Sequence, residues 1–197
     1  MKVTLLLPMK ANSERIPNKN LKIFNSKPLF HAVLDESIKS KYIKKVIINT
    51  DSDLIIESAK SNYNDYVKIH RRPEHLLGDF ISMNKIIEYD LNNSDSDIYI
   101  QTHSTSPLLT IKSIDSAIAK MINNSTSFDS IFSVTKIQTR FYYENGNPLN
   151  HDSKQLIRTQ DLEPLFEENS GFYIFTKESF KNADNKRIGL NPFMFEI

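Results

Sequence analysis

Residues 3–20 read VTLLLPMKANSERIPNKN, and this stretch decides the fold class. Its first part, residues 3–7, is apolar at nearly every position, which is typical of a strand buried on both faces in a parallel sheet. Its second part, residues 9–20, is a polar loop that follows the strand directly. Because ligands of open α/β sheets bind beyond the carboxyl ends of the strands, this loop is the first candidate for a binding site.

Beyond this stretch, short apolar runs alternate with segments of helical periodicity. The runs predicted as strands are 46–48, 66–69, 98–100, 131–134, 172–175 and a final segment at 193–197. The predicted helices cover about 29–38, 54–59, 82–91 and 111–122, and a short one follows residue 175. Strands that alternate with helices indicate βαβ units, so we predict a single α/β domain over residues 1–197 with a mostly parallel sheet.

The composition of the chain excludes several classes of protein. Lysine and arginine (25) nearly balance aspartate and glutamate (24), whereas proteins that coat nucleic acid carry a strong basic excess. The chain has no cysteine, which excludes disulfides, thiolate chemistry and cysteine-bound metal centres. No apolar run is long enough to span a membrane. We therefore expect a soluble, cytoplasmic protein with neither nucleic acid nor membrane as a partner.

The first loop combines positive charge with small polar side chains. Lys10, Arg15 and Lys19 lie there together with Asn12 and Ser13. A triphosphate needs this combination of fixed cations and hydrogen-bond donors, although a solvated basic loop has the same composition. The loop has neither the Gly-Lys-Ser/Thr of a P-loop nor a G-x-G-x-x-G motif, which argues against both of those phosphate sites.

Short motifs along the chain resemble those of the acylneuraminate (CMP-sialic acid synthetase-type) cytidylyltransferases. In the first loop the matching pairs are Asn12-Ser13, Ile16-Pro17 and Lys19-Asn20, with the family's spacing. Further matches follow in the family's order: Lys27-Pro28-Leu29, Asn49-Thr50-Asp51, Arg72-Pro73-Glu74, Thr105-Ser106-Pro107-Leu108, Arg158-Thr159-Gln160-Asp161-Leu162 and Asn169-Ser170-Gly171-Phe172-Tyr173-Ile174. Matches in order over nearly the whole chain make the resemblance specific.

The resemblance implies a fold and an activity. The fold is a three-layer α/β/α sandwich, Rossmann-like, as in the nucleotide-diphospho-sugar transferases. The activity is that of a cytidylyltransferase, which activates a nine-carbon, sialic acid-like 2-keto acid sugar with CTP to give a CMP-sugar and pyrophosphate. Such a step depends on positioning and on neutralising developing charge, and Mg²⁺ is the implied cofactor.

The resemblance also implies which residues form the site. Lys10 and Lys19 are expected to be catalytic cations that hold the triphosphate. The expected nucleotide-binding residues are Met9, Lys10, Asn12, Ser13, Arg15, Lys19, Asn20, Arg72, Thr105 and Ser106. The expected sugar-binding residues are His103, Arg158, Gln160, Asn169 and Tyr173, with Arg158 as the partner of the sugar carboxylate.

The sequence departs from the family's pattern at three positions of the expected site. Lys10 replaces an arginine, so the charge is kept but the bidentate fork is lost. Glu14 replaces a lysine, and His103 stands where the family has a glutamine. These departures leave open a nucleotidyltransferase for another sugar or nucleotide, and also a non-catalytic nucleotide-binding homologue.

The metal ligands are not evident in the sequence. In the family an Asp-Ile-Asp segment helps to hold Mg²⁺, and it is expected shortly after Ile197, beyond the present chain. Asp51-Ser52-Asp53 precedes a predicted helix, where capping explains it better than metal binding. Asp95-Ser96-Asp97 precedes its strand and so lies at the wrong end of the sheet.

The segment from about 141 to 168 is long for a loop inside a compact domain. Its Asn145-Gly146 pair predicts a hairpin or an extended excursion. In the resembled family this region makes a dimer contact and lends residues to the neighbouring active site. We therefore expect a homodimer.

Overall fold

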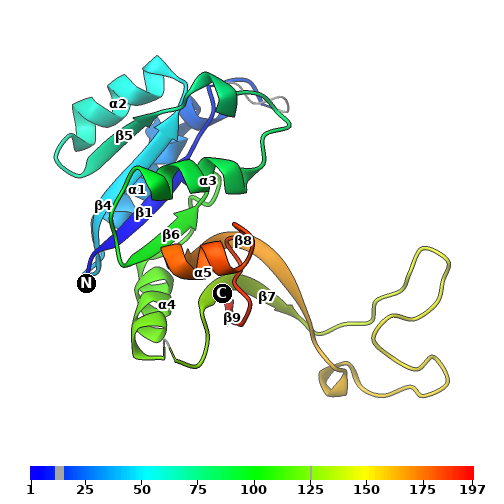
Figure 1. Cartoon of the computed structure of the whole chain (residues 1–197). Coiled ribbons are helices and arrows are strands. Elements are labelled where there is room, and N and C mark those ends of the chain that lie inside the picture. Colours follow the sequence, from blue (N-terminus) through cyan, green and yellow to red (C-terminus); the bar gives the residue numbers. More distant parts are fainter. Residues whose placement is uncertain (12–15, 125) are drawn as a thin grey trace.

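The computed structural model describes residues 1–11, 16–124 and 126–197. Its centre is a seven-stranded sheet of order β5-β4-β1-β6-β8-β7-β9. The strands are β1 (Val3–Pro8), β4 (Ile43–Thr50), β5 (Val67–Arg71), β6 (Ile98–Thr102), β7 (Ser130–Ile137), β8 (Leu165–Phe175) and β9 (Pro192–Glu196). All neighbouring strands pair in parallel except β8, which is antiparallel to both β6 and β7. The predicted strands are all present, and the mostly parallel sheet is confirmed (Figure 1).

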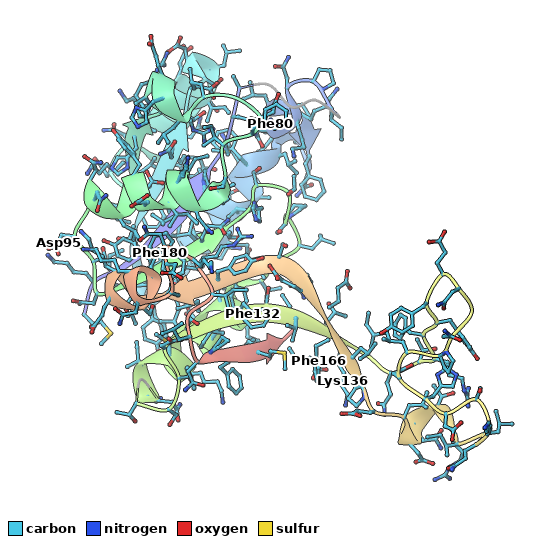
Figure 2. The ribbon with its side chains drawn as sticks, turned by 45° about the vertical axis from the view of Figure 1, so that its right-hand side comes forward. Phe80, Asp95, Phe132, Lys136, Phe166 and Phe180 are labelled. Atoms are coloured by element: carbon cyan, nitrogen blue, oxygen red, sulfur yellow. The ribbon has the colours of Figure 1, made fainter. Side chains whose placement is uncertain are left out.

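Helices cover both faces of this sheet. One apolar cluster joins α1 (Leu29–Ser37), α2 (Asp53–Tyr63) and α4 (Ile111–Asn123) to one face, where Leu5 and Leu7 of β1 point. A second cluster joins α3 (Met83–Asn92) and α5 (Lys177–Asn182) to the other face, where Leu6 points. The alternation of side chains along β1 thus serves both layers, and the three-layer α/β/α sandwich is confirmed. In Figure 2 the labelled Phe180 of α5 lies against the sheet.

Capping explains where several helices begin. Ser52 accepts a hydrogen bond from the Ile55 amide at the start of α2, at 3.3 Å. The prediction that the Asp51-Ser52-Asp53 triplet caps a helix is therefore confirmed for Ser52. The prediction that Ile38 lies on the buried stripe of α1 is wrong, because the helix ends at Ser37 and Ile38 is 46% exposed.

A small hairpin between β1 and α1 was not expected from the sequence. It consists of β2 (Ile23–Phe24) and β3 (Lys27–Pro28), joined by Asn25 and Ser26. Both joining residues have positive φ, 48° and 66°, as a tight two-residue hairpin turn requires. Neither residue is a glycine, so the usual sequence signal for such a turn is missing.

Residues 138–164, here called the arm, leave the body of the molecule between β7 and β8 (Figure 1). Tyr142 and Pro148 form an antiparallel bridge there, and Gly146 supplies the positive φ of the turn, 83°. The predicted excursion and its hairpin are thus present. Figure 2 shows Lys136 and Phe166, which pair across β7 and β8, at the base of the arm.

β9 forms the last strand at one edge of the sheet. It pairs in parallel with β7, so its carboxyl end lies at the same edge as the carboxyl ends of β1 and β6. Within the part of the chain that the structure describes, no helix combines the length and the apolar character needed to cross a bilayer.

Candidate functional site

A hollow of about 230 Å³ lies beyond the carboxyl ends of β1 and β6. Its cationic and polar lining comes from the first loop, the segment after β5 and the segment after β6. Its apolar lining comes from the end of β1 and from α3 and the residues before it. The lining residues are Pro8, Met9, Lys10, Lys19, Asn20, Arg72, Gly78, Asp79, Ile81, Met83, Ile86, His103, Ser104 and Thr105. The predicted site residues Met9, Lys10, Lys19, Asn20, Arg72, His103 and Thr105 are therefore brought together.

Arg72 lines this hollow and joins the carboxyl ends of β1 and β4 through hydrogen bonds. Its side chain is buried and donates to the Met9 carbonyl at 3.0 Å, the Asn49 carbonyl at 3.0 Å and Asn49 Oδ1 at 2.9 Å. Burial lowers the pKa of this guanidinium below its usual value, while Asp51 and Asp90 act in the opposite direction. Its hydrogen bonds therefore hold two backbone carbonyls and the Asn49 side chain, and the predicted contact of Arg72 with the nucleotide stays a prediction.

A buried carboxylate holds the Asn49 side chain that contacts Arg72. Asp90 of α3 accepts hydrogen bonds from the side-chain nitrogen of Asn49 and from His70 Nδ1, both at 2.7 Å. All three side chains are buried. The chain of contacts runs from α3 through Asn49 to Arg72 and the Met9 carbonyl, so it fixes the position from which the first loop departs.

Asn20 ties the far end of the first loop to the segment after β6. Its side-chain amide donates to the Lys10 carbonyl at 3.1 Å, and its Oδ1 accepts from the Ser104 hydroxyl at 2.6 Å. Asn20 is buried, so its role is to close the loop on itself next to the hollow.

Two lysines bring positive charge to the hollow. Lys10 forms an ion pair with Asp79, and both side chains are partly exposed. Lys19 is half-buried, and its positive charge contributes to lowering the pKa of His103. Because a partly exposed ion pair is weak, a polyanionic ligand can take the place of Asp79 at Lys10.

His103 is a neutral imidazole at physiological pH. Burial, followed by the positive charges of Arg187 and Lys19, lowers its pKa to about 4. Its Nε2 lies 3.3 Å from the side-chain nitrogen of Gln101 and accepts that hydrogen bond, because Gln101 Nε2 is a donor only. Nδ1 therefore carries the proton, and His103 presents a neutral N–H donor where the resembled family has a glutamine amide.

A second hollow, of about 470 Å³, adjoins the first along Met83. It is lined by Ser82, Met83, Asn84, Glu168, Lys186, Arg187 and Ile188. The predicted sugar residue Tyr173 lies beside it, and its hydroxyl donates to Glu168 and lies 3.2 Å from the Ser170 hydroxyl. The guanidinium carbon of Arg187 lies 3.8 Å from the centre of the Tyr173 ring. Sequence reasoning missed Arg187, since it stands in an irregular polar segment that matches no motif.

A third hollow, of about 490 Å³, contains other predicted residues. Thr105, Ser106 and Asn169 line it, together with Gly171 and Ile197. Asn169 is held by hydrogen bonds from the Ser133 hydroxyl at 2.6 Å and the Gly171 amide at 3.1 Å. Thr105 lines both this hollow and the first, so the two are neighbours.

The structure does not bring Arg158 and Gln160 to any of these hollows. Both lie in the arm, and Arg158 pairs with Asp161 through contacts of 2.7 and 3.2 Å. The Arg158 side chain is 74% exposed. The predicted residues Asn12, Ser13 and Arg15 lie outside the described residues.

The described residues do not form a carboxylate site for Mg²⁺. Among them no group of three or more His, Asp or Glu side chains is placed to hold a metal. Asp51 and Asp79 line a small hollow beside Lys10, but Asp51 accepts the Ala11 amide at 2.7 Å and Asp79 pairs with Lys10. Asp95 and Asp97 contact Lys2 at the opposite end of the sheet, as the sequence predicted.

Comparisons with known proteins agree with this geometry. The family model for cytidylyltransferases matches residues 4–191. A pseudaminic acid cytidylyltransferase of Campylobacter jejuni is 28% identical over 195 residues, which cover 93% of this chain and 82% of that protein. An N-acylneuraminate cytidylyltransferase of Oncorhynchus mykiss is 30% identical over 190 residues, which cover 92% of this chain and 43% of that protein.

A solved structure confirms the fold. It is a CMP:2-keto-3-deoxy-manno-octonic acid synthetase complexed with CTP, with a TM-score of 0.73 and 13% identity, and the match covers 100% of this chain and 90% of that one. At this identity the likeness bears on the fold alone. The family model, in contrast, spans the first loop, both lysines and the sheet edge that carries the hollows. The chain therefore belongs to the cytidylyltransferase family.

Proposed function

We propose that this cytidylyltransferase transfers CMP from CTP to a 2-keto acid sugar and releases pyrophosphate. The observation that carries the proposal is the first hollow, where Lys10 and Lys19 converge beyond the carboxyl ends of β1 and β6. Two cations beside an apolar wall suit a nucleoside triphosphate, which joins a polyanion to a flat base. The relatives that act on sugar acids support the second substrate.

In the proposed reaction the anomeric hydroxyl of the sugar attacks the α-phosphorus of CTP. A phosphorus–oxygen bond forms to the sugar, the bond to pyrophosphate breaks, and the hydroxyl proton passes to solvent. Lys10 and Lys19 neutralise the charge that gathers on the departing pyrophosphate. Thr105 lines both the first and the third hollow, so it is placed to contact the bound nucleotide.

We further propose that the acceptor is a nine-carbon sugar acid of the sialic acid or pseudaminic acid class. Both names occur among the relatives, so the family match alone does not separate them. Tyr173 and Asn169 are the predicted sugar-binding residues that lie beside the second and third hollows. The cytoplasmic location expected from the composition stays a prediction.

Mg²⁺ is proposed as the cofactor of this reaction. Asp51 and Asp79 are engaged by the Ala11 amide and by Lys10, so they do not fit a divalent cation. The acidic segment expected after Ile197 stays a prediction. β9 ends at the sheet edge that holds the hollows, and Ile197 lines the third of them with Thr105 and Asn169.

The test is pyrophosphate release in the presence of Mg²⁺, with CTP, UTP, ATP and GTP each offered with three sugar acids. These are N-acetylneuraminic acid, pseudaminic acid and 2-keto-3-deoxy-manno-octonic acid. We expect release with CTP and with one of the two nine-carbon acids. Release with another nucleotide, or with the octonic acid only, would replace the substrate proposed here. Binding of CTP without release in any combination would identify a non-catalytic homologue.

A further inference from the structure

Arg187 lines the second hollow, and its guanidinium is held by two neighbouring side chains. Its Nη1 donates to Gln101 Oε1 at 2.7 Å, and its guanidinium carbon lies 3.8 Å above the Tyr173 ring. Gln101 and Tyr173 are themselves fully buried in neighbouring strands, β6 and β8. The guanidinium is therefore preorganised, so little side-chain entropy is lost when a ligand binds to its remaining N–H groups.

The charge of Arg187 is not balanced by an acidic neighbour. Among the described residues, the ion pairs join other side chains and none includes Arg187. Glu168 lines the same hollow and brings one negative charge, and its carboxylate accepts the Tyr173 hydroxyl. Lys186 adds a second positive charge to the lining. The hollow thus presents an oriented fork of N–H donors and a net positive charge.

This hollow lies on the acceptor side of the nucleotide site. Met83 lines both hollows, and Gln101 bonds to Arg187 with one side-chain atom and to His103 with the other. His103 lines the nucleotide hollow. A molecule in the second hollow would therefore contact Arg187 while its other end points along Met83 to the nucleotide hollow.

We infer that Arg187 binds the carboxylate of the acceptor sugar acid within the same chain. A planar guanidinium with parallel N–H groups matches a carboxylate in a bidentate pair, which a rigid support makes selective. This inference rests on the proposed function, because it identifies the group of the acceptor that the second hollow recognises. Arg158, for which the sequence predicted a contact with this carboxylate, lies in the arm and pairs with Asp161 of the same chain.

The experiment compares each sugar acid with its primary carboxamide, which has the same shape without the negative charge. Binding of both is measured by calorimetry at saturating CTP without metal, for the unchanged protein and for Arg187→Gln, Arg187→Met and Arg187→Lys. We expect the unchanged protein to prefer the acid by about tenfold or more, the size of a charge-assisted bidentate contact. The preference should fall to about threefold or less in Arg187→Gln and be intermediate in Arg187→Lys.

A matched control separates this role from net charge and from folding. Lys181→Gln removes one positive charge from the exposed side of α5 and should keep the full preference for the acid. Arg187→Met keeps an aliphatic stack on Tyr173, and its CTP affinity should stay within about twofold of the unchanged protein. KM for the acid should rise in all three Arg187 variants while KM for CTP does not change.

The outcomes are distinct. If the unchanged protein binds a sugar acid and Arg187→Gln keeps the preference for the acid, the inference is overturned and the proposed function stands. Equal affinity of the unchanged protein for acid and carboxamide overturns it as well. If the unchanged protein binds no sugar acid of the panel in the presence of CTP, the proposed function itself fails.

Discussion

Lys19 is a half-buried cation that lines the nucleotide hollow, and its positive charge contributes to the lowered pKa of His103. We expect Lys19→Ala to weaken CTP binding more than tenfold, which corresponds to about 1.4 kcal/mol or more, because a phosphate group loses its charge-assisted partner. Calorimetry measures the affinity, and Lys22→Ala is the control, since Lys22 is exposed on the same segment. Equal affinities for the two variants would remove the first loop from the phosphate site.

His103 gives a second prediction at the scale of one residue. Its pKa of about 4 lies below the ordinary 6.5, because burial disfavours the charged ring. Between about pH 4 and 6.5 the unfolded chain binds a proton at His103 that the folded chain does not bind. The stability that the neutral His103 contributes is therefore complete above about pH 6.5 and is lost as the pH falls to about 4. NMR titration of the ring protons, assigned with His103→Gln, measures the pKa directly. A value near 6.5 would contradict the neutral donor described above.

Besides its apolar contacts with the sheet, helix α3 carries a buried carboxylate, Asp90, which accepts hydrogen bonds from Asn49 and His70. We expect Asp90→Ala to lower the free energy of unfolding by about 3 kcal/mol, because two buried donors lose their acceptor. Denaturant unfolding measures this loss. Glu57→Ala, an exposed acidic position on α2, should change stability by less than about 0.5 kcal/mol.

Asp90→Ala should also affect nucleotide binding. Asn49 holds the Arg72 side chain, and Arg72 holds the Met9 carbonyl from which the first loop departs. A looser Asn49 should therefore weaken CTP binding in Asp90→Ala under conditions where the variant is fully folded. Full affinity in a destabilised variant would show that α3 supports the sheet without positioning the loop.

The elements differ in how far the sequence predicts them. Parallel strands such as β1 and β6 contain short apolar runs, residues 5–7 and 98–100, and the helices between the strands are amphipathic, so both are evident from local patterns. The antiparallel direction of β8 is set by distant partners. The register of β7 and β8 also shifts: Phe132 pairs with Tyr173, whereas Val134 pairs with Glu168. A local sequence pattern does not encode such an irregularity.

The site was predictable to the extent that its residues belong to one loop or motif. Lys10, Lys19 and Asn20 follow a recognisable strand, and His103 and Thr105 follow another. Arg187 meets Gln101 only through the tertiary fold, across 86 residues of sequence. The positions of Arg158 and Gln160 depend on how far the arm projects, which composition does not determine.

At the scale of the whole molecule, the arm carries apolar side chains that the rest of the chain does not cover. Leu156 is 92% exposed, Tyr142 and Tyr143 are each 57% exposed, and Phe166 at the base of the arm is 41% exposed. Exposed apolar patches of this kind mark interfaces, so we expect a homodimer joined through the arm. Light scattering at micromolar concentration should give twice the mass of one chain.

Substitutions in the arm test this expectation. Tyr142→Ser together with Leu156→Ser should shift the mass toward that of one chain, because both positions are exposed in the single chain and contribute little to its own core. Leu54→Ser is the control, since Leu54 is also exposed but lies on α2. A mass of one chain for the unchanged protein would exclude the dimer at that concentration.

The position of β8 in the middle of the sheet has a consequence for synthesis on the ribosome. β6 gains its second neighbour only when β8 is made, as in the bond from the Thr102 hydroxyl to the Gly171 carbonyl, 69 residues further along the chain. Until then the nascent sheet ends in an unpaired strand edge, which is a template for aggregation. Chains that terminate within the arm should therefore accumulate in inclusion bodies. Chains that extend past Phe175 pair β8 with β6 and should remain in the soluble fraction.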